Sequence, residues 1–232
     1  MASISLYLNN LIYKSRHNIL NMLKTRGFNT KEYENYTQDE LILLLEKHQQ
    51  GKFQNALELS PLDIKLTDNN DRTIIVKYRL DEKFKKTELL LKHINDIFET
   101  YKLNKDTDCV IIMNINRILI KPGTKDDPVQ GFVNLCYLRK MFVQIYGLEN
   151  FMFDITKHQF VPKHTVLNND EAIDVLLKYN VKIQNLPKIN REDPIVKFIG
   201  GRPNQIIKIE SFNPTTGLSV TYRLVVKYLA NS

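Results

Sequence analysis

The sequence predicts an α/β N-terminal domain, with a mixed sheet flanked by helices, followed by a small α+β C-terminal domain. Over residues 1–150, segments with helical apolar spacing alternate with segments of strand-like spacing, which is typical of a sheet covered by helices. Over residues 151–232, short strands and Pro or Gly turns replace that pattern. The chain has 232 residues, enough for two small domains.

Composition excludes several classes of protein. Apolar residues make up 43% and charged residues 25%, which are ordinary globular values and exclude a fully disordered chain. The two cysteines form neither a disulfide framework nor a zinc ribbon, so we expect a reducing compartment. No signal peptide and no long apolar run is present, so no membrane association is expected.

The net charge of +7 is spread over both halves of the chain. Such a balance fits a protein that lies near nucleic acid without gripping it alone. A solvated, lysine-rich surface explains the same charge equally well.

The first part of the chain begins with two predicted helices. Apolar spacing predicts a helix over 3–26, and Gly27 ends it. Thr37 and Glu40 form a predicted capping box at the start of the second helix. An antiparallel helix pair is the economical interpretation. Alternating residues over 62–66 and 72–80 then predict a β-hairpin.

The middle of the chain alternates helices and strands. We predict a helix over 86–101 and a buried central strand over 109–115, which is a continuous apolar run. A loop over 122–128, a helix over 132–146 and a strand over 151–155 follow.

The last third has shorter elements. Residues 158–164 predict an extended loop, and Asn168 or Asn169 caps a helix that runs to Lys178. Its inward residues are predicted to be Ile173, Leu176 and Leu177. The remaining predicted elements are an extended segment at 186–189, a short helix begun by Asp193-Pro194, a tight loop at 200–203, and strands at 205–210 and 218–226.

A search for reactive groups finds no catalytic constellation. His158 and His164 are close in sequence, but a zinc site needs two more ligands, and Cys109 and Cys136 are distant. The acidic pairs at 81–82 and 126–127 stand among lysines in polar stretches, which favours solvated loops over a metal-binding pair. We therefore expect no catalytic residue, no metal, no cofactor and no small-molecule substrate. A nuclease built on the N-terminal sheet and a stand-alone DNA-binding protein stay open as alternatives.

The order of motifs in the tail carries a resemblance to a known family. H-x-x-V-P-x-H at 158–164 is followed by a helix, L-P-x-I at 186–189, D-P at 193–194, a Gly-Arg loop and T-Y-R at 221–223. Over residues 153–226 this order resembles the C-terminal assembly domain of the small subunit shared by the three eukaryotic nuclear RNA polymerases and by the archaeal enzyme.

The resemblance implies a non-catalytic subunit of a multisubunit DNA-directed RNA polymerase. Its C-terminal domain would dock on the largest subunit, within a complex of other polymerase subunits, and nucleotidyl transfer would take place elsewhere. The interface residues that it implies are His158, Pro162, His164, Leu186, Pro187, Asp193, Pro194, Gly200, Gly201, Arg202, Tyr222 and Arg223.

The N-terminal part resembles the eukaryotic protein only in the order of its elements. In those polymerases this part forms a jaw beside downstream duplex DNA, so the resemblance implies weak, nonspecific contact with DNA. The candidate residues for phosphate proximity are Lys83, Lys85, Lys86 and Lys121.

One loop departs from the cellular pattern of a single glycine followed by a basic pair. Gly200-Gly201-Arg202-Pro203 is more similar to the polymerases of large cytoplasmic DNA viruses, and the abundance of Ile, Asn and Lys favours the same source. A viral protein would be found with the transcription complex in virions and cytoplasmic virus factories. A divergent cellular protein would be found in the nucleus.

Overall fold

The computed structural model describes residues 2–50, 58–80, 87–115, 128–213 and 217–227. The chain divides into two compact units, Met1–Phe153 and Asp154–Ser232, which we call the N-terminal and C-terminal units. Each unit contains its own four-stranded sheet.

The sheet of the N-terminal unit is mixed, as predicted. Its strands are β1 (Ile64–Thr67), β2 (Thr73–Arg79), β3 (Cys109–Asn114) and β4 (Val143–Gly147), in the order β1-β2-β3-β4. β1 pairs antiparallel with β2, which confirms the predicted hairpin, and the other pairs are parallel. Every residue of β3 is buried, because this apolar strand lies in the middle of the sheet with helices over both faces.

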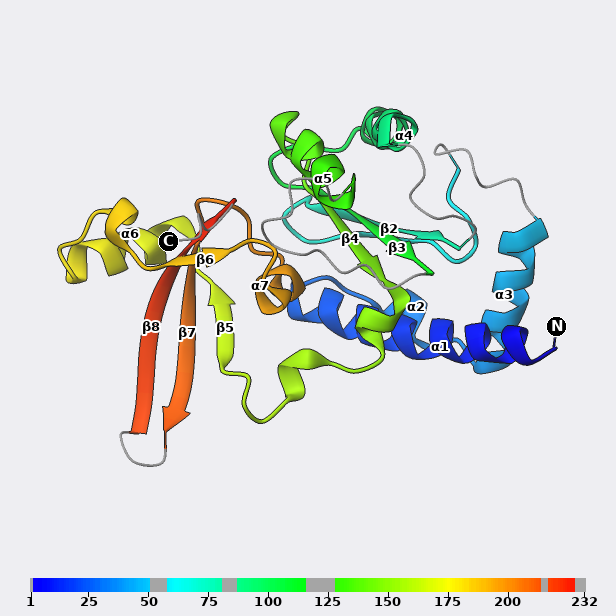
Figure 1. Cartoon of the computed structure of the whole chain (residues 1–232), viewed down its shortest axis with the longest axis horizontal. Coiled ribbons are helices and arrows are strands. Elements are labelled where there is room, and N and C mark those ends of the chain that lie inside the picture. Colours follow the sequence, from blue (N-terminus) through cyan, green and yellow to red (C-terminus); the bar gives the residue numbers. More distant parts are fainter. Residues whose placement is uncertain (1, 51–57, 81–86, 116–127, 214–216, 228–232) are drawn as a thin grey trace. The chain divides into compact units, whose positions relative to one another are not determined.

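Helices flank this sheet (Figure 1). α4 and α5 lie over one face and α1 lies over the other. The helices of the unit are α1 (Ala2–Thr25), α2 (Lys31–Glu34), α3 (Gln38–Gln50), α4 (Thr87–Thr100) and α5 (Pro128–Leu138).

The predicted caps of the first helices are present. Phe28 donates its backbone N–H to the Leu23 carbonyl past Gly27, which has a φ of 92°, so α1 ends in the left-handed turn that glycine allows. Glu40 and Thr37 form the expected capping box at α3. The prediction of an antiparallel pair is wrong, because α3 crosses α1 instead of running alongside it (Figure 1).

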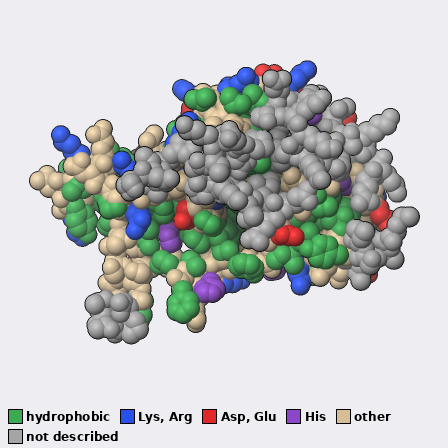
Figure 2. All heavy atoms as spheres, in the orientation of Figure 1, with side chains coloured by type: hydrophobic (Ala, Val, Ile, Leu, Met, Phe, Trp, Pro, Cys, Tyr) green, Lys and Arg blue, Asp and Glu red, His purple; other side chains and the backbone are tan. Residues whose placement is uncertain are grey.

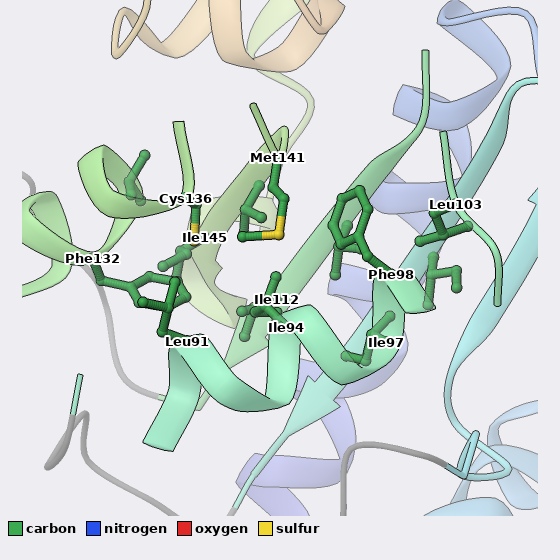
Figure 3. Close-up of a cluster of buried hydrophobic side chains, with 14 of the residues drawn as sticks. Leu91, Ile94, Ile97, Phe98, Leu103, Ile112, Phe132, Cys136, Met141 and Ile145 are labelled. Carbon is green, nitrogen blue, oxygen red and sulfur yellow. The ribbon is translucent and has the colours of Figure 1, made fainter. Parts of the chain in front are cut away.

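One hydrophobic core of the unit lies between α4, α5 and the sheet (Figure 3). Leu91 and Ile94 project from α4 toward Phe132 of α5 and Ile112 of β3, and Phe98 lies farther along the same helix, on the side of Leu103. Helical spacing of three and four residues places the α4 side chains on one face, so the amphipathic pattern accounts for the layer. Both cysteines are buried, and Cys136 belongs to this core.

Two predictions in this unit are wrong. The helix expected over 132–146 ends at Leu138, because Lys140 adopts a φ of 62° and turns the chain into β4. No strand forms over 151–155; the 3-10 turn Leu148–Phe151 follows β4 directly. The apolar residues that follow the turn at Lys140 are buried as a parallel edge strand, so tertiary burial decided their conformation.

The C-terminal unit is an α+β arrangement of one sheet and two helices. Its strands are β5 (Lys163–Val166), β6 (Lys188–Asn190), β7 (Ile206–Asn213) and β8 (Gly217–Val226), in the order β5-β7-β8-β6. Its helices are α6 (Asn169–Lys178) and α7 (Pro194–Ile199), with 3-10 turns at Ile155–Lys157 and Ile183–Asn185. The predicted final strands are confirmed, and β5 forms partly within the segment expected to be a loop.

Among the described helices, none has the length and hydrophobicity needed to span a bilayer.

Candidate partner interface

Helix α6 buries one apolar stripe and exposes another. Asn168 caps it through a capping box with Glu171, as predicted. Leu176 packs on the sheet, together with Ala172 and Val175. The prediction that Ile173 and Leu177 point inward is wrong: their exposed fractions are 55% and 73%. The stripe nearer the sheet is covered, so these two side chains, four residues apart, are left on the open flank of the helix.

The free end of the β7–β8 hairpin is also apolar. Phe212 pairs opposite Leu218, and Glu210 pairs opposite Val220, so all four lie on one face of the sheet. Phe212 and Leu218 are 76% and 66% exposed. We call Ile173, Leu177, Phe212, Leu218 and Val220 the exposed apolar set.

The exposed apolar set was not identified from the sequence as a candidate interface. Two apolar residues four apart on a helix are equally typical of a buried core position. Alternation along a strand does not show where the helix that covers the sheet ends. Figure 2 shows hydrophobic side chains at the surface over α6. Isolated exposed apolar residues are normal, and a group of five in one small unit is a candidate surface for a partner.

The motif residues around α7 shape the backbone. Asp193 accepts hydrogen bonds from the backbone N–H of Ile195 and Val196, and Pro194 occupies the first helical position. Gly200 ends the helix with a φ of 75°. Gly201 is buried, and a Cβ there would lie 2.8 Å from Val196 Cγ1.

These glycines therefore end α7 and lead into β7. The loop at Gly200 thus precedes β7 and does not join β7 to β8, which are connected through the segment between Asn213 and Gly217. Arg202 donates its backbone N–H to Gln205 Oε1 at 2.7 Å, within the same loop.

Leu186 and Pro187 attach β6 to the sheet. Leu186 is buried in a cluster with Leu167, Ile206 and Leu224. The Pro187 carbonyl accepts from the Leu224 N–H at 2.8 Å, while its ring is exposed. The ring of Pro187 is thus the part that a partner could contact.

His158 lies in the segment leading into β5, and His164 lies within β5. His164 donates from Nδ1 to the Pro162 carbonyl at 2.7 Å, which orients the ring. His158 is exposed beside Phe160, with ring centroids 5.7 Å apart. Within the described ranges, no three His, Cys, Asp or Glu side chains cluster as metal ligands would.

Tyr222 and Arg223 point to opposite faces of β8. Tyr222 packs against the α6 side of the sheet, with its ring centroid 5.8 Å from that of Tyr179. Arg223 is exposed and pairs opposite Ile207. The motif residues are thus spread over the whole unit, and their interface role stays a prediction.

Charge on this unit is balanced locally. Lys208 contacts Glu210 at 2.6 Å, and Lys163 lies 3.5 Å from the same carboxylate. The hydrogen bond from Lys208 and the charges of both lysines hold the pKa of Glu210 below its ordinary value. Among the described residues on the face shown in Figure 2, Lys and Arg side chains are scattered, without one dominant patch. The four lysines predicted near DNA, Lys83, Lys85, Lys86 and Lys121, lie outside the described residues.

Comparison with known proteins places this unit in a family. Residues 153–225 match the family described as RNA polymerase Rpb5, C-terminal domain. The DNA-directed RNA polymerase subunit Rpo5 of Methanocaldococcus jannaschii is 41% identical over 73 residues, which cover 32% of this chain and 94% of that protein.

Eukaryotic relatives extend the match. The subunit RPABC1 of DNA-directed RNA polymerases I, II and III from Caenorhabditis elegans is 40% identical over 86 residues, covering 35% of this chain and 41% of that protein. The corresponding protein of Dictyostelium discoideum is 26% identical over 217 residues, covering 94% of this chain and 98% of that protein. The motif order, the fold of the C-terminal unit and these matches agree: the chain belongs to the Rpb5/Rpo5 family of RNA polymerase subunits.

Proposed function

We propose that the chain is a non-catalytic subunit of a multisubunit DNA-directed RNA polymerase and acts as a scaffold. Its C-terminal unit docks on the largest subunit. Family membership supports the assignment to the complex. The exposed apolar set is the observation that carries the docking proposal, because Ile173, Leu177, Phe212 and Leu218 gain free energy only when a partner removes them from water.

Affinity purification of the tagged full chain from its native setting tests this proposal. We expect near-stoichiometric recovery of the largest polymerase subunit with the wild-type chain. Leu177→Asp introduces a charge into the exposed apolar set. We expect it to reduce that recovery at least several-fold, because burying a carboxylate in an interface is costly unless a cation or hydrogen-bond donor pairs with it.

Asn169→Asp is the matched control for charge. Asn169 is an exposed residue in the first turn of the same helix, where a carboxylate is favourable. Recovery should stay at the wild-type level in this variant. Equal recovery with Leu177→Asp and wild type would remove α6 from the docking surface, and failure to recover any large subunit would contradict the scaffold role itself.

The motif residues support a second part of the interface. His158, Pro187, Pro194 and Arg223 are exposed and remain candidates for direct contact. Replacing Arg223 with Ala should weaken incorporation while the isolated chain keeps its fold, as checked by circular dichroism. Leu186, Asp193, Gly200 and Gly201 would act indirectly, by shaping the unit.

The N-terminal unit is proposed to act as the jaw, over about residues 1–150, and the remainder as the assembly domain. Its contact with downstream DNA would be electrostatic, so the affinity of the assembled enzyme for duplex should fall as salt rises. Charge reversal at Lys83, Lys85, Lys86 and Lys121 should flatten that salt dependence. An unchanged slope would remove these lysines from the DNA path.

A source in a large DNA virus remains a prediction from the loop at 200–203 and the Ile, Asn and Lys bias. The relatives named above come from archaea and cellular eukaryotes and give it no support. The compartment follows the source, because the chain is expected wherever its polymerase is assembled.

A further inference from the structure

The helices of the N-terminal unit enclose a pocket that the polymerase motifs do not involve. Its volume is about 110 Å³, and its lining includes Arg16, His17, Tyr33 and Tyr36. A water molecule needs roughly 10–15 Å³ of such space, so the pocket has room for several waters or for one small polar group.

Arg16 forms the buried part of this pocket. Its side chain is only 2% exposed, and Nη1 donates to the Leu62 carbonyl at 2.6 Å. The guanidinium carbon lies 5.8 Å from the Tyr33 ring centroid and 5.6 Å from that of Tyr36. The tyrosine rings lie near the guanidinium and the Leu62 carbonyl accepts from one of its nitrogens, so the group is held in place.

One donor of Arg16 is unsatisfied. Nε is buried without a hydrogen-bond partner, and among the described residues no carboxylate forms an ion pair with this side chain. Tyr78 also lies against this guanidinium, with its ring centroid 6.0 Å from the guanidinium carbon, so the contacts of Arg16 are with neutral groups. A buried cation without a counterion is costly, so an anion that enters the pocket beside it would be bound favourably.

The nearby charges favour an anion as that acceptor. Lys24 contacts Glu34 Oε1 at 2.9 Å, so these two opposite charges largely cancel. Hydrogen bonds from Thr30 and Lys24 hold the pKa of Glu34 below its ordinary value, so it stays ionised at neutral pH. The positive charge of Arg16 is left over, with His17 at the exposed rim.

We propose that this pocket binds one anionic side chain of a partner polypeptide, either a carboxylate or a phosphorylated residue. The size of the pocket suits a single charged group. Nucleic acid is disfavoured, because Glu32, Asp39 and Glu40, in the first turns of α2 and α3 and outside the pocket lining, would repel a chain of phosphates.

The test is an NMR titration of the full chain that follows the Arg16 Nε–H resonance and the tyrosine rings. The probes are N-acetyl-glutamate methylamide and N-acetyl-phosphoserine methylamide, with N-acetyl-glutamine methylamide as the neutral counterpart. We expect saturable shifts with the two anionic probes and none with the glutamine probe. The anionic probe that binds more tightly identifies whether the ligand is a carboxylate or a phosphorylated residue. A single-stranded oligonucleotide should not displace either probe.

Two variants locate the site. Arg16→Met should abolish the saturable shifts of the tyrosine rings. His17→Glu places a carboxylate at the rim without touching the buried groups, and it should raise the dissociation constant at least tenfold. Asn10→Glu adds the same charge at an exposed position two turns earlier on α1 and should leave binding unchanged.

Each result supports the site or removes it. Non-saturating shifts, equal shifts with the glutamine probe, or equal weakening by His17→Glu and Asn10→Glu would overturn the proposal. Displacement by the oligonucleotide would replace the peptide with nucleic acid as the ligand. None of these outcomes bears on whether the chain docks on the largest polymerase subunit.

Discussion

The two units use sheets of equal strand number and cover them to different extents. In the N-terminal unit, all residues of β3 and β4 are buried. In the C-terminal unit, β8 is exposed or half-exposed at most positions, and only Leu224 and Val225 are buried. The first sheet is covered by its own helices, whereas the second leaves apolar side chains exposed to water.

The two units also differ in how widely they are shared among relatives. The incompletely covered unit is the part shared at 41% identity with an archaeal protein of nearly its own size. Over nearly the whole chain, the identity to the Dictyostelium protein is 26%. The surface proposed for docking thus belongs to the widely shared part of the molecule.

The largest expected effect lies in the N-terminal unit, where a charged pair is buried. Lys77 Nζ lies 3.7 Å from Asp63 Oδ2, and Asp63 also accepts from the backbone N–H of Ser60 and Tyr78. Lys77→Met leaves the carboxylate without its cation, so we expect a loss of about 3 kcal/mol in the free energy of unfolding, measured in urea. Lys92→Met, at an exposed position of α4, should change it by less than about 0.5 kcal/mol.

The same pair predicts a pH dependence. Burial raises the pKa of Asp63 above its ordinary 3.8, and the charge of Lys77 opposes that rise. Between 3.8 and the raised value, the folded state binds more protons than the unfolded state, so the unfolding free energy contributed by Asp63 falls as pH rises through this window. In Lys77→Met the raised pKa moves higher, and the fall should extend to higher pH. Identical pH profiles for both proteins would contradict this assignment.

A smaller effect is expected from a close backbone approach in the C-terminal unit. Gly201→Ala would place a Cβ 2.8 Å from Val196 Cγ1 and 3.4 Å from the Val196 carbonyl oxygen, so we expect a loss of about 1–3 kcal/mol. Hydrogen exchange should show faster opening of α7 and β7.

Gly131 is the matched control in the other unit. It lies inside α5, and a Cβ there would meet nothing within 4 Å. Gly131→Ala should therefore stabilise the helix, by up to about 1 kcal/mol. If both substitutions shift stability in the same direction, the contrast in local packing is wrong.

Local sequence predicts much of the structure of the two units, and the predictions that failed show what it does not determine. The caps at Thr37, Asn168 and Asp193 were predictable because each uses a side chain that bonds its own helix. The end of α5 was not, since Lys140 takes the left-handed conformation usually given to glycine. The outward position of Leu177 depends on which stripe of α6 the sheet covers, and local spacing does not contain that information.

The pocket around Arg16 was equally hidden from sequence. Its residues come from α1, α2, α3 and the segment between α2 and α3. Only the tertiary arrangement shows that one guanidinium nitrogen lacks a partner. Helix caps can be predicted because they depend on residues that are neighbours in the sequence, whereas exposed surfaces depend on how distant segments pack.

The smallest expected effect tests one cap in the less covered unit. Asp193 accepts two backbone N–H groups at the start of α7, so Asp193→Ala should lower the free energy of unfolding by about 1 kcal/mol. Asp193→Asn retains an acceptor oxygen and should recover most of that loss. Because α7 packs Val196 against the sheet opposite α6, fraying of its first turn should speed hydrogen exchange on that face and leave α6 unaffected. Equal acceleration in α6 would mean that the two faces of this sheet open together, and that the unit is more cooperative than its partial coverage suggests.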